Sequence, residues 1–154
     1  MKKYLITACV YMGLGLALGV FFREFTKFNG FTGVTALGKT HLHALVLGMA
    51  FFLIAAFAED RFAVRGSKLE RWFYLSYNTG LGIFLVMLLV RGICQVTEAS
   101  LSDGANGAIS GVAGIGHILI AIGLVLFFII LLKNCNAVVK KSQKPQNEEQ
   151  KKEI

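Results

Sequence analysis

Four long apolar segments, separated by short polar connections, constrain the fold of this chain more than any other feature. They cover residues 4–22, 33–57, 72–91 and 108–132. A helix rises about 1.5 Å per residue, so about 20 apolar residues are enough to cross the hydrocarbon core of a membrane. Each segment is continuously apolar rather than alternating, which favours a helix over a transmembrane β-strand. The sequence therefore predicts an all-α integral membrane domain of four spanning helices in residues 1–132.

The composition supports this fold class. Of the 154 residues, 55% are hydrophobic and only 16% are charged, whereas soluble domains carry about 25% charged residues. The single proline, Pro145, lies outside the apolar segments, in the polar and basic stretch 133–154. We expect this stretch to form a cytoplasmic tail that is partly disordered.

The basic residues are distributed unevenly between the two sides of such a domain. With four spans, the N-terminus, the middle connection and the tail share one side, and together they carry twelve of the sixteen Lys and Arg residues. The positive-inside rule places that side in the cytoplasm. We therefore predict an up-down four-helix bundle with both termini cytoplasmic. Because this topology explains the net charge of +7, we predict the lipid bilayer as partner and no nucleic acid.

Three histidines lie in the second and fourth segments, where an ionisable side chain usually faces a partner or a cavity. They are His41 and His43 in the second segment and His117 in the fourth. Both segments run in the same direction in the predicted topology, and His43 and His117 each lie about 15 Å below the start of their helix. His41 and His43 are separated by about 200° around a helix, so a regular helix cannot point both at one site. His41 shares its face with small residues and is slightly the more interior of the two, but the choice between them stays open.

Three interpretations of these histidines compete. In the first, each imidazole bonds a neighbouring helix and is structural, and the protein is a non-catalytic scaffold or accessory protein. In the second, His117 and either His41 or His43 are the axial ligands of a heme b, with Arg91 and Lys39 near its propionates. In the third, the same imidazoles hold zinc or copper or line the path of a small metal or solute transporter.

Other sequence features narrow the function classes. The chain contains no nucleophile–base pair, no paired catalytic carboxylates and no phosphate-binding loop, so we predict no catalytic residue. Gly15 and Gly19 form a small-residue pair in the first segment, which allows close helix packing inside the bundle or in a homo-oligomer. Asn78 in the third segment is expected to form a hydrogen bond between helices.

The chain resembles a family of small four-helix bacterial membrane proteins known as a domain of unknown function. The matching pieces are HLHALVLGM at 41–49, YNTGLGIFLVMLLVRGICQV at 77–96 and ISGVAGIGHILIAIGL at 109–124. HLHALVLG is also similar to histidine-bearing helices of the heme-copper oxidase and nitric oxide reductase superfamily, where such histidines hold heme. These resemblances imply a protein of the bacterial cytoplasmic membrane, and the second makes heme b the favoured interpretation, with an unknown redox partner.

Overall fold

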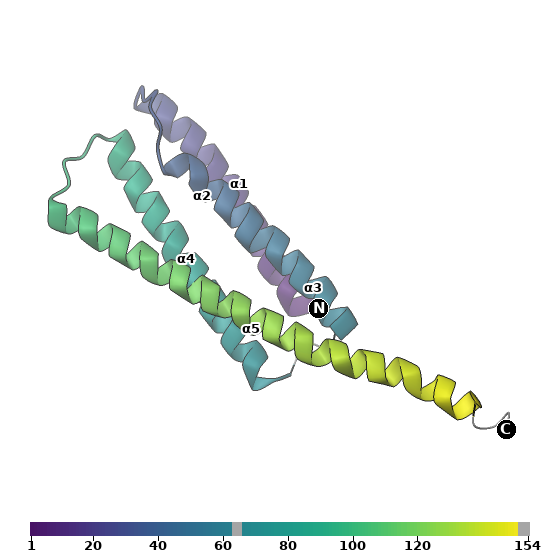
Figure 1. The fold of residues 1–154 in the computed structure, drawn as a ribbon. Helices are drawn as coiled ribbons and strands as arrows, with labels where there is room; N and C mark the ends of the chain where they lie inside the picture. Colours follow the sequence, from purple (N-terminus) through teal and green to yellow (C-terminus); the bar gives the residue numbers. More distant parts are fainter. Residues whose placement is uncertain (63–65, 151–154) are drawn as a thin grey trace.

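The computed structural model describes the backbone of residues 1–62 and 66–150 and the side chains of residues 1–59, 62 and 66–135. In these residues the chain is all-helical, which confirms the predicted class. The elements are α1 (Lys2–Phe28), α2 (Leu37–His43), the π-helix η1 (Ala44–Ala50), α3 (Phe51–Phe62), α4 (Lys68–Val96) and α5 (Asp103–Gln150). Because α2, η1 and α3 follow one another without a break, they form one continuous rod (Figure 1).

Four helical stretches of the described chain are long and apolar enough to cross a membrane. They are Lys2–Phe28, Leu37–Glu59, Lys68–Val96 and Asp103–Cys135. Their outward faces carry large apolar side chains such as Val10, Ile118 and Phe128, which are all more than half exposed. Such surfaces are unfavourable in water and suit hydrocarbon. The structure thus indicates a multi-pass membrane protein.

The helices begin and end at other residues than the apolar segments do. Hydrogen bonds at the helix termini determine where each helix begins and ends. α1 continues past residue 22 through the polar segment to Phe28. Gly30, with φ of 61°, donates to the Lys27 carbonyl at 3.1 Å, and Phe31 donates to the Thr26 carbonyl at 3.0 Å. This pair of bonds is a Schellman motif, in which glycine adopts the left-handed conformation that ends the helix.

The second and fourth spanning helices also begin away from their predicted starts. α2 begins at Leu37 rather than at residue 33, because the Thr35 hydroxyl accepts from the Leu37 amide at 3.2 Å and donates to the Gly92 carbonyl at 3.0 Å. α5 begins at Asp103, earlier than residue 108, where the Ser102 side chain accepts from the Ala105 amide at 3.2 Å. α5 then continues beyond residue 132 to Gln150. The disorder expected for residues 133–154 stays a prediction.

The rods are arranged as two pairs. α1 packs along α2, η1 and α3, and α4 packs along α5 (Figure 1). Glycines allow the close approach in both pairs. A Cβ atom on Gly80 would lie 2.7 Å from the Gly116 carbonyl oxygen of α5, and one on Gly15 would lie 2.7 Å from the Leu45 side chain. Gly15 therefore allows close packing between helices of the same chain, and Gly19 likewise faces His41. The predicted homo-oligomer stays a prediction.

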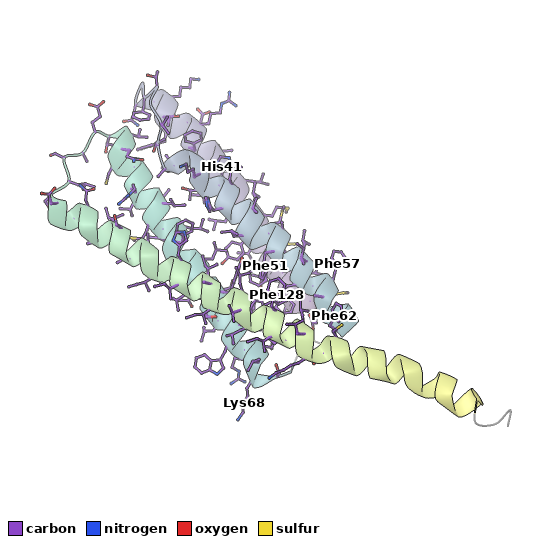
Figure 2. All side chains as sticks on the ribbon, in the orientation of Figure 1. His41, Phe51, Phe57, Phe62, Lys68 and Phe128 are labelled. Atoms are coloured by element: carbon purple, nitrogen blue, oxygen red, sulfur yellow. The ribbon has the colours of Figure 1, made fainter. Side chains whose placement is uncertain are left out.

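A cluster of buried aromatic rings joins the two pairs in the half of the molecule that contains the N-terminus. Phe52, Phe73 and Tyr77 are fully buried. Phe51 lies between the rods (Figure 2), with its ring centroid 4.3 Å from that of Tyr77 and 5.3 Å from that of Phe127. Aromatic side chains bury large areas, so this cluster is the main core of the protein.

Side-chain hydrogen bonds also connect α1 directly to α4. The Lys3 ammonium donates to Glu70 at 3.0 Å, the Thr7 and Tyr74 hydroxyls are 2.8 Å apart, and the Tyr11 hydroxyl donates to Asn78 at 3.1 Å. The Tyr11–Asn78 bond confirms the interhelical role predicted for Asn78. Each of these three pairs is 67 residues apart in sequence, so α1 and α4 run in the same direction. We call these three pairs the α1–α4 ladder.

Candidate functional site

Two of the three histidines meet on one aromatic ring. Phe84 of α4 lies with its ring centroid 5.1 Å from that of His43 on α2 and 4.1 Å from that of His117 on α5. Both contacts are edge-on, with interplanar angles of 73° and 61°. The structure therefore places the two imidazoles at the same level along the helices. Phe84, which both imidazoles contact, is almost fully buried.

His43 and His117 also make the same hydrogen bond. The Nδ1 atom of His43 lies 2.7 Å from the Lys39 carbonyl oxygen, and that of His117 lies 3.1 Å from the Ala113 carbonyl oxygen. A carbonyl oxygen can only accept, so Nδ1 carries the hydrogen in both rings. In a neutral imidazole this leaves the lone pair on Nε2. Metal-ligating histidines are commonly oriented in this way, by a hydrogen bond from the other ring nitrogen.

His41 faces a different part of the molecule. Its ring stacks on Phe22 of α1 at 6.1 Å between centroids, with an interplanar angle of 16°. A Cβ atom on Gly19, also in α1, would lie 3.7 Å from the ring. The Nδ1 atom of His41 is buried and has no hydrogen-bond partner among the described residues. Of the two candidates in the second segment, His43 is the one that the structure brings together with His117.

The helix changes its winding directly after His43. The π-helix η1 spans Ala44–Ala50, and the buried Tyr77 hydroxyl of α4 donates to the Leu47 carbonyl within it at 2.8 Å. π-Helical turns are rare and occur often at functional sites. Here the π-helix also changes the rotation of α3 relative to α2, and the hydroxyl of Tyr77 contacts the segment where this change occurs.

Arg91 lies near the C-terminal end of α4, two turns beyond Phe84. Its guanidinium donates to the Ser110 hydroxyl at 2.7 Å and approaches the Asn106 carbonyl at 3.5 Å. A cavity of about 310 Å³ extends from Arg91 to His117 and Phe84. The other basic candidate, Lys39, is exposed, and its contact with the histidines is made by its backbone carbonyl.

A site that needs three protein ligands does not form around the histidines. No group of three or more His, Cys, Asp or Glu residues that could hold a metal ion occurs in the part of the chain that the structure describes. The three imidazoles do not form such a group, because His41 stacks on Phe22 whereas His43 and His117 contact Phe84. A metal-containing cofactor held by these histidines would therefore have at most two imidazole ligands from the described residues.

The comparison with protein families agrees with the resemblance found in the sequence. A family model described as "Protein of unknown function (DUF2871)" matches residues 1–134. The chain belongs to this family. A search of the curated proteins and a search of the solved structures each found no match. The similarity of the HLHALVLG segment to heme-copper oxidase helices therefore stays a prediction.

Two residues of this candidate site, Phe84 and Tyr77, were not predicted as site residues from the sequence. Both lie in the third apolar segment, where an aromatic residue is most simply explained as core. A signal was nevertheless present, because Tyr77, Phe84 and Arg91 are each seven residues apart. Residues seven apart lie on the same face of a helix, so one face of α4 carries all three side chains that contact or adjoin the site.

Proposed function

We propose that this protein is a heme-b-binding protein of the bacterial cytoplasmic membrane, and that His43 and His117 would hold the heme iron. The observation that carries the proposal is the shared geometry of the two imidazoles. They come from two different spanning helices, lie at the same level on one ring, and each directs Nδ1 to its own helix. Two unprotonated Nε2 atoms are the donor set that a six-coordinate heme iron takes from a protein.

The topology in this proposal is an up-down bundle with both termini on the cytoplasmic side. The α1–α4 ladder supports it, since helices that run in the same direction begin on the same side of a membrane. The placement of twelve basic residues on that side agrees with the positive-inside rule. The histidine site then lies in the outer half of the membrane, and the exposed aromatic Trp72 lies near the cytoplasmic interface, where tryptophan is enriched.

The surrounding residues would hold the cofactor in defined ways. Arg91 lies at the outer mouth of the cavity, and its guanidinium has five N–H donors, enough to bind a propionate while it keeps Ser110. Lys39 is exposed near the same level and would bind a second carboxylate. Bound here, heme b would supply one-electron transfer. The protein's own contribution is to fix both imidazoles through the Lys39 and Ala113 carbonyls.

Phe84 imposes a condition on this proposal. Its ring contacts both imidazoles in this structure, and we expect the Phe84 side chain to turn aside when a macrocycle binds the two histidines. The adjacent cavity, which Met87, Ile109 and Gly114 help to line, is bounded by apolar surface that suits either the ring or a porphyrin edge. We therefore expect Phe84 to occupy the space between the histidines when heme is absent.

The test is the absorption spectrum of the protein purified in detergent from heme-replete cells. The wild type and the His41→Ala variant should show a Soret band, and the His43→Ala and His117→Ala variants should lose it. His41→Ala is the matched control, because it removes an imidazole from the same helix on the opposite side.

Three results would contradict the proposal. A colourless wild type that contains metal by elemental analysis would favour a zinc or copper site or a transporter. A colourless and metal-free wild type would favour a scaffold with structural histidines. Loss of the Soret band only in His41→Ala would show that His41, which faces α1, holds the heme instead of His43 and His117.

A further inference from the structure

A second site lies on the other face of α4, in a groove between α1 and α4. Its volume is about 500 Å³, within the range of about 300–1,000 Å³ that is typical of small-molecule sites. From Ile6 to Leu18 the α1 wall is about 18 Å long at the rise of a helix. None of the three histidines lines this groove, so it is separate from the proposed heme site.

The groove is polar at one end and apolar at the other. Thr7, Tyr11, Tyr74 and Asn78, which belong to the α1–α4 ladder, lie at the polar end. The amide nitrogen of Asn78 donates to the Tyr74 carbonyl at 2.8 Å. An amide nitrogen has two hydrogens, so Asn78 retains a second donor. Toward Leu18 and Leu89 the walls are entirely aliphatic.

The charge of the lining limits what can occupy the groove. All twelve residues that line it are uncharged. Lys3, one turn beyond the polar end, already pairs with Glu70 at 3.0 Å and lies 3.6 Å from the centroid of the Tyr74 ring. A phosphate head group buried here would lack a free cation, and burial of an unpaired charge is costly. A neutral head group with hydrogen-bond acceptors has no such cost.

We propose that the groove binds an isoprenoid quinone from the bilayer. A quinone combines a small neutral ring, two carbonyl acceptors and a long apolar chain. One carbonyl accepts from the Asn78 amide, and the chain lies along the aliphatic walls toward Leu18 and Leu89. This inference does not rest on the heme proposal, and failure of one leaves the other testable.

Gly82 offers a direct way to block the groove. It lines the α4 wall, and a Cβ atom built on it would meet nothing within 4 Å. The Cβ atom of a Gly82→Leu variant therefore lies in open space, and its side chain would occupy part of the groove. Gly111 on α5 is the matched control, because a Cβ atom there also meets nothing within 4 Å and the residue does not line the groove.

The experiment measures binding of a decyl-substituted benzoquinone to the full chain in phospholipid nanodiscs by calorimetric titration. The wild type and Gly111→Leu should bind with equal affinity, and Gly82→Leu should bind at least tenfold more weakly. Asn78→Leu should lose up to about tenfold, since a hydrogen bond contributes about 0.5–1.5 kcal/mol and tenfold corresponds to about 1.4 kcal/mol. Solvent extraction of the purified protein should release a quinone from the wild type and not from Gly82→Leu.

Several outcomes would overturn the proposal. One is a wild type that does not bind the quinone, and another is equal binding by Gly82→Leu. If the extract contains only phospholipid, the groove holds an acyl chain instead. If Gly82→Leu changes the oligomeric state in light scattering while quinone binding is unaltered, the groove is an interface between copies of this chain.

Discussion

The two halves of this molecule are packed in different ways. In the half that contains the N-terminus, the aromatic half, Phe52 is fully buried and its ring centroid lies 5.6 Å from Tyr77, 5.9 Å from Tyr11 and 6.1 Å from Tyr4. In the opposite half, the histidine half, Phe84 contacts two imidazoles, and a cavity of about 310 Å³ lies beside Phe84 and His117.

This difference sets a densely packed cluster of rings apart from a region where polar groups border a cavity. Dense packing of rings resists change, because a lost side chain leaves a cavity that the neighbours fill only in part. Polar side chains that border a cavity are packed less closely, and such cavities are where proteins commonly bind small molecules. We infer that stability comes mainly from the aromatic half, and that the cavity beside His117 leaves room for the proposed cofactor.

The strongest test of this comparison removes a ring from the aromatic half. Phe52→Ala should lower the free energy of unfolding by about 3–5 kcal/mol, the usual cost of deleting a buried phenylalanine ring. Unfolding in mixed micelles, followed by circular dichroism, gives this quantity. Phe57 is the control, because it lies on the same helix with 71% of its surface exposed (Figure 2). A comparable loss in Phe57→Ala would show that the cluster is not the source of stability.

The next largest effect concerns the glycines where α4 crosses α5. Gly80→Ala places a Cβ atom 2.7 Å from the Gly116 carbonyl oxygen and the Ile120 amide nitrogen, so the helices must separate. We expect a loss of about 1–3 kcal/mol, as for other overpacked sites. Gly82→Ala, two residues further along, meets nothing within 4 Å and should be neutral or stabilising by up to about 1 kcal/mol. Equal unfolding free energies for the two variants would mean that α4 and α5 are not in close contact.

A third prediction sharpens the comparison from the histidine half. In the proposed function, heme binding to His43 and His117 requires the Phe84 ring to leave its buried position. Burial of such a ring contributes about 1.5–3 kcal/mol to stability, and part of this free energy is lost when the ring moves. Phe84→Leu removes the ring and should therefore raise the affinity for heme by about tenfold, equivalent to about 1.4 kcal/mol. Titration of the heme-free protein with hemin, followed at the Soret band, measures the affinity.

The control for this prediction lies in the other half. Phe51→Leu changes a ring that contacts Tyr77 and Phe127 and no histidine of the pair, so it should leave the heme affinity unchanged. If Phe84→Leu binds heme no better than the wild type while its fold is intact, Phe84 does not occupy the heme position.

The sequence was sufficient for the spanning segments, because the hydrophobic effect acts on long runs and does not depend on neighbouring helices. It was less informative about helix ends. The Schellman motif at Gly30 depends on one left-handed residue, and the start of α2 depends on a bond from Thr35 to the distant Gly92. Neither long-range bonds nor a left-handed conformation can be deduced from an apolar run.

For the site, the sequence predicted the depth of the histidines and not the direction in which they face. Depth follows from the constant rise of a helix, and in the structure His43 and His117 both contact Phe84. Direction depends on how the rods pack. The small residues beside His41 made it the more interior candidate, but they pack against α1, so His41 faces Phe22 instead of α5. The π-helix that follows His43 could not be deduced from composition either.

The smallest expected effect tests the boundary between the two halves. Tyr77 belongs to the aromatic half, yet its hydroxyl donates to the Leu47 carbonyl in the π-helix that follows His43. Tyr77→Phe keeps the ring and removes one hydrogen bond, which in membrane helices contributes about 0.6 kcal/mol on average. We expect that loss in unfolding free energy and, because η1 is then held less firmly, a measurable change in the electron paramagnetic resonance g-values of the ferric heme. Ser76→Ala is the control, since the Ser76 hydroxyl donates to the Phe73 carbonyl of its own helix at 3.2 Å. A Tyr77→Phe protein with wild-type g-values would show that the halves are independent, and that the π-helix keeps its position through packing alone.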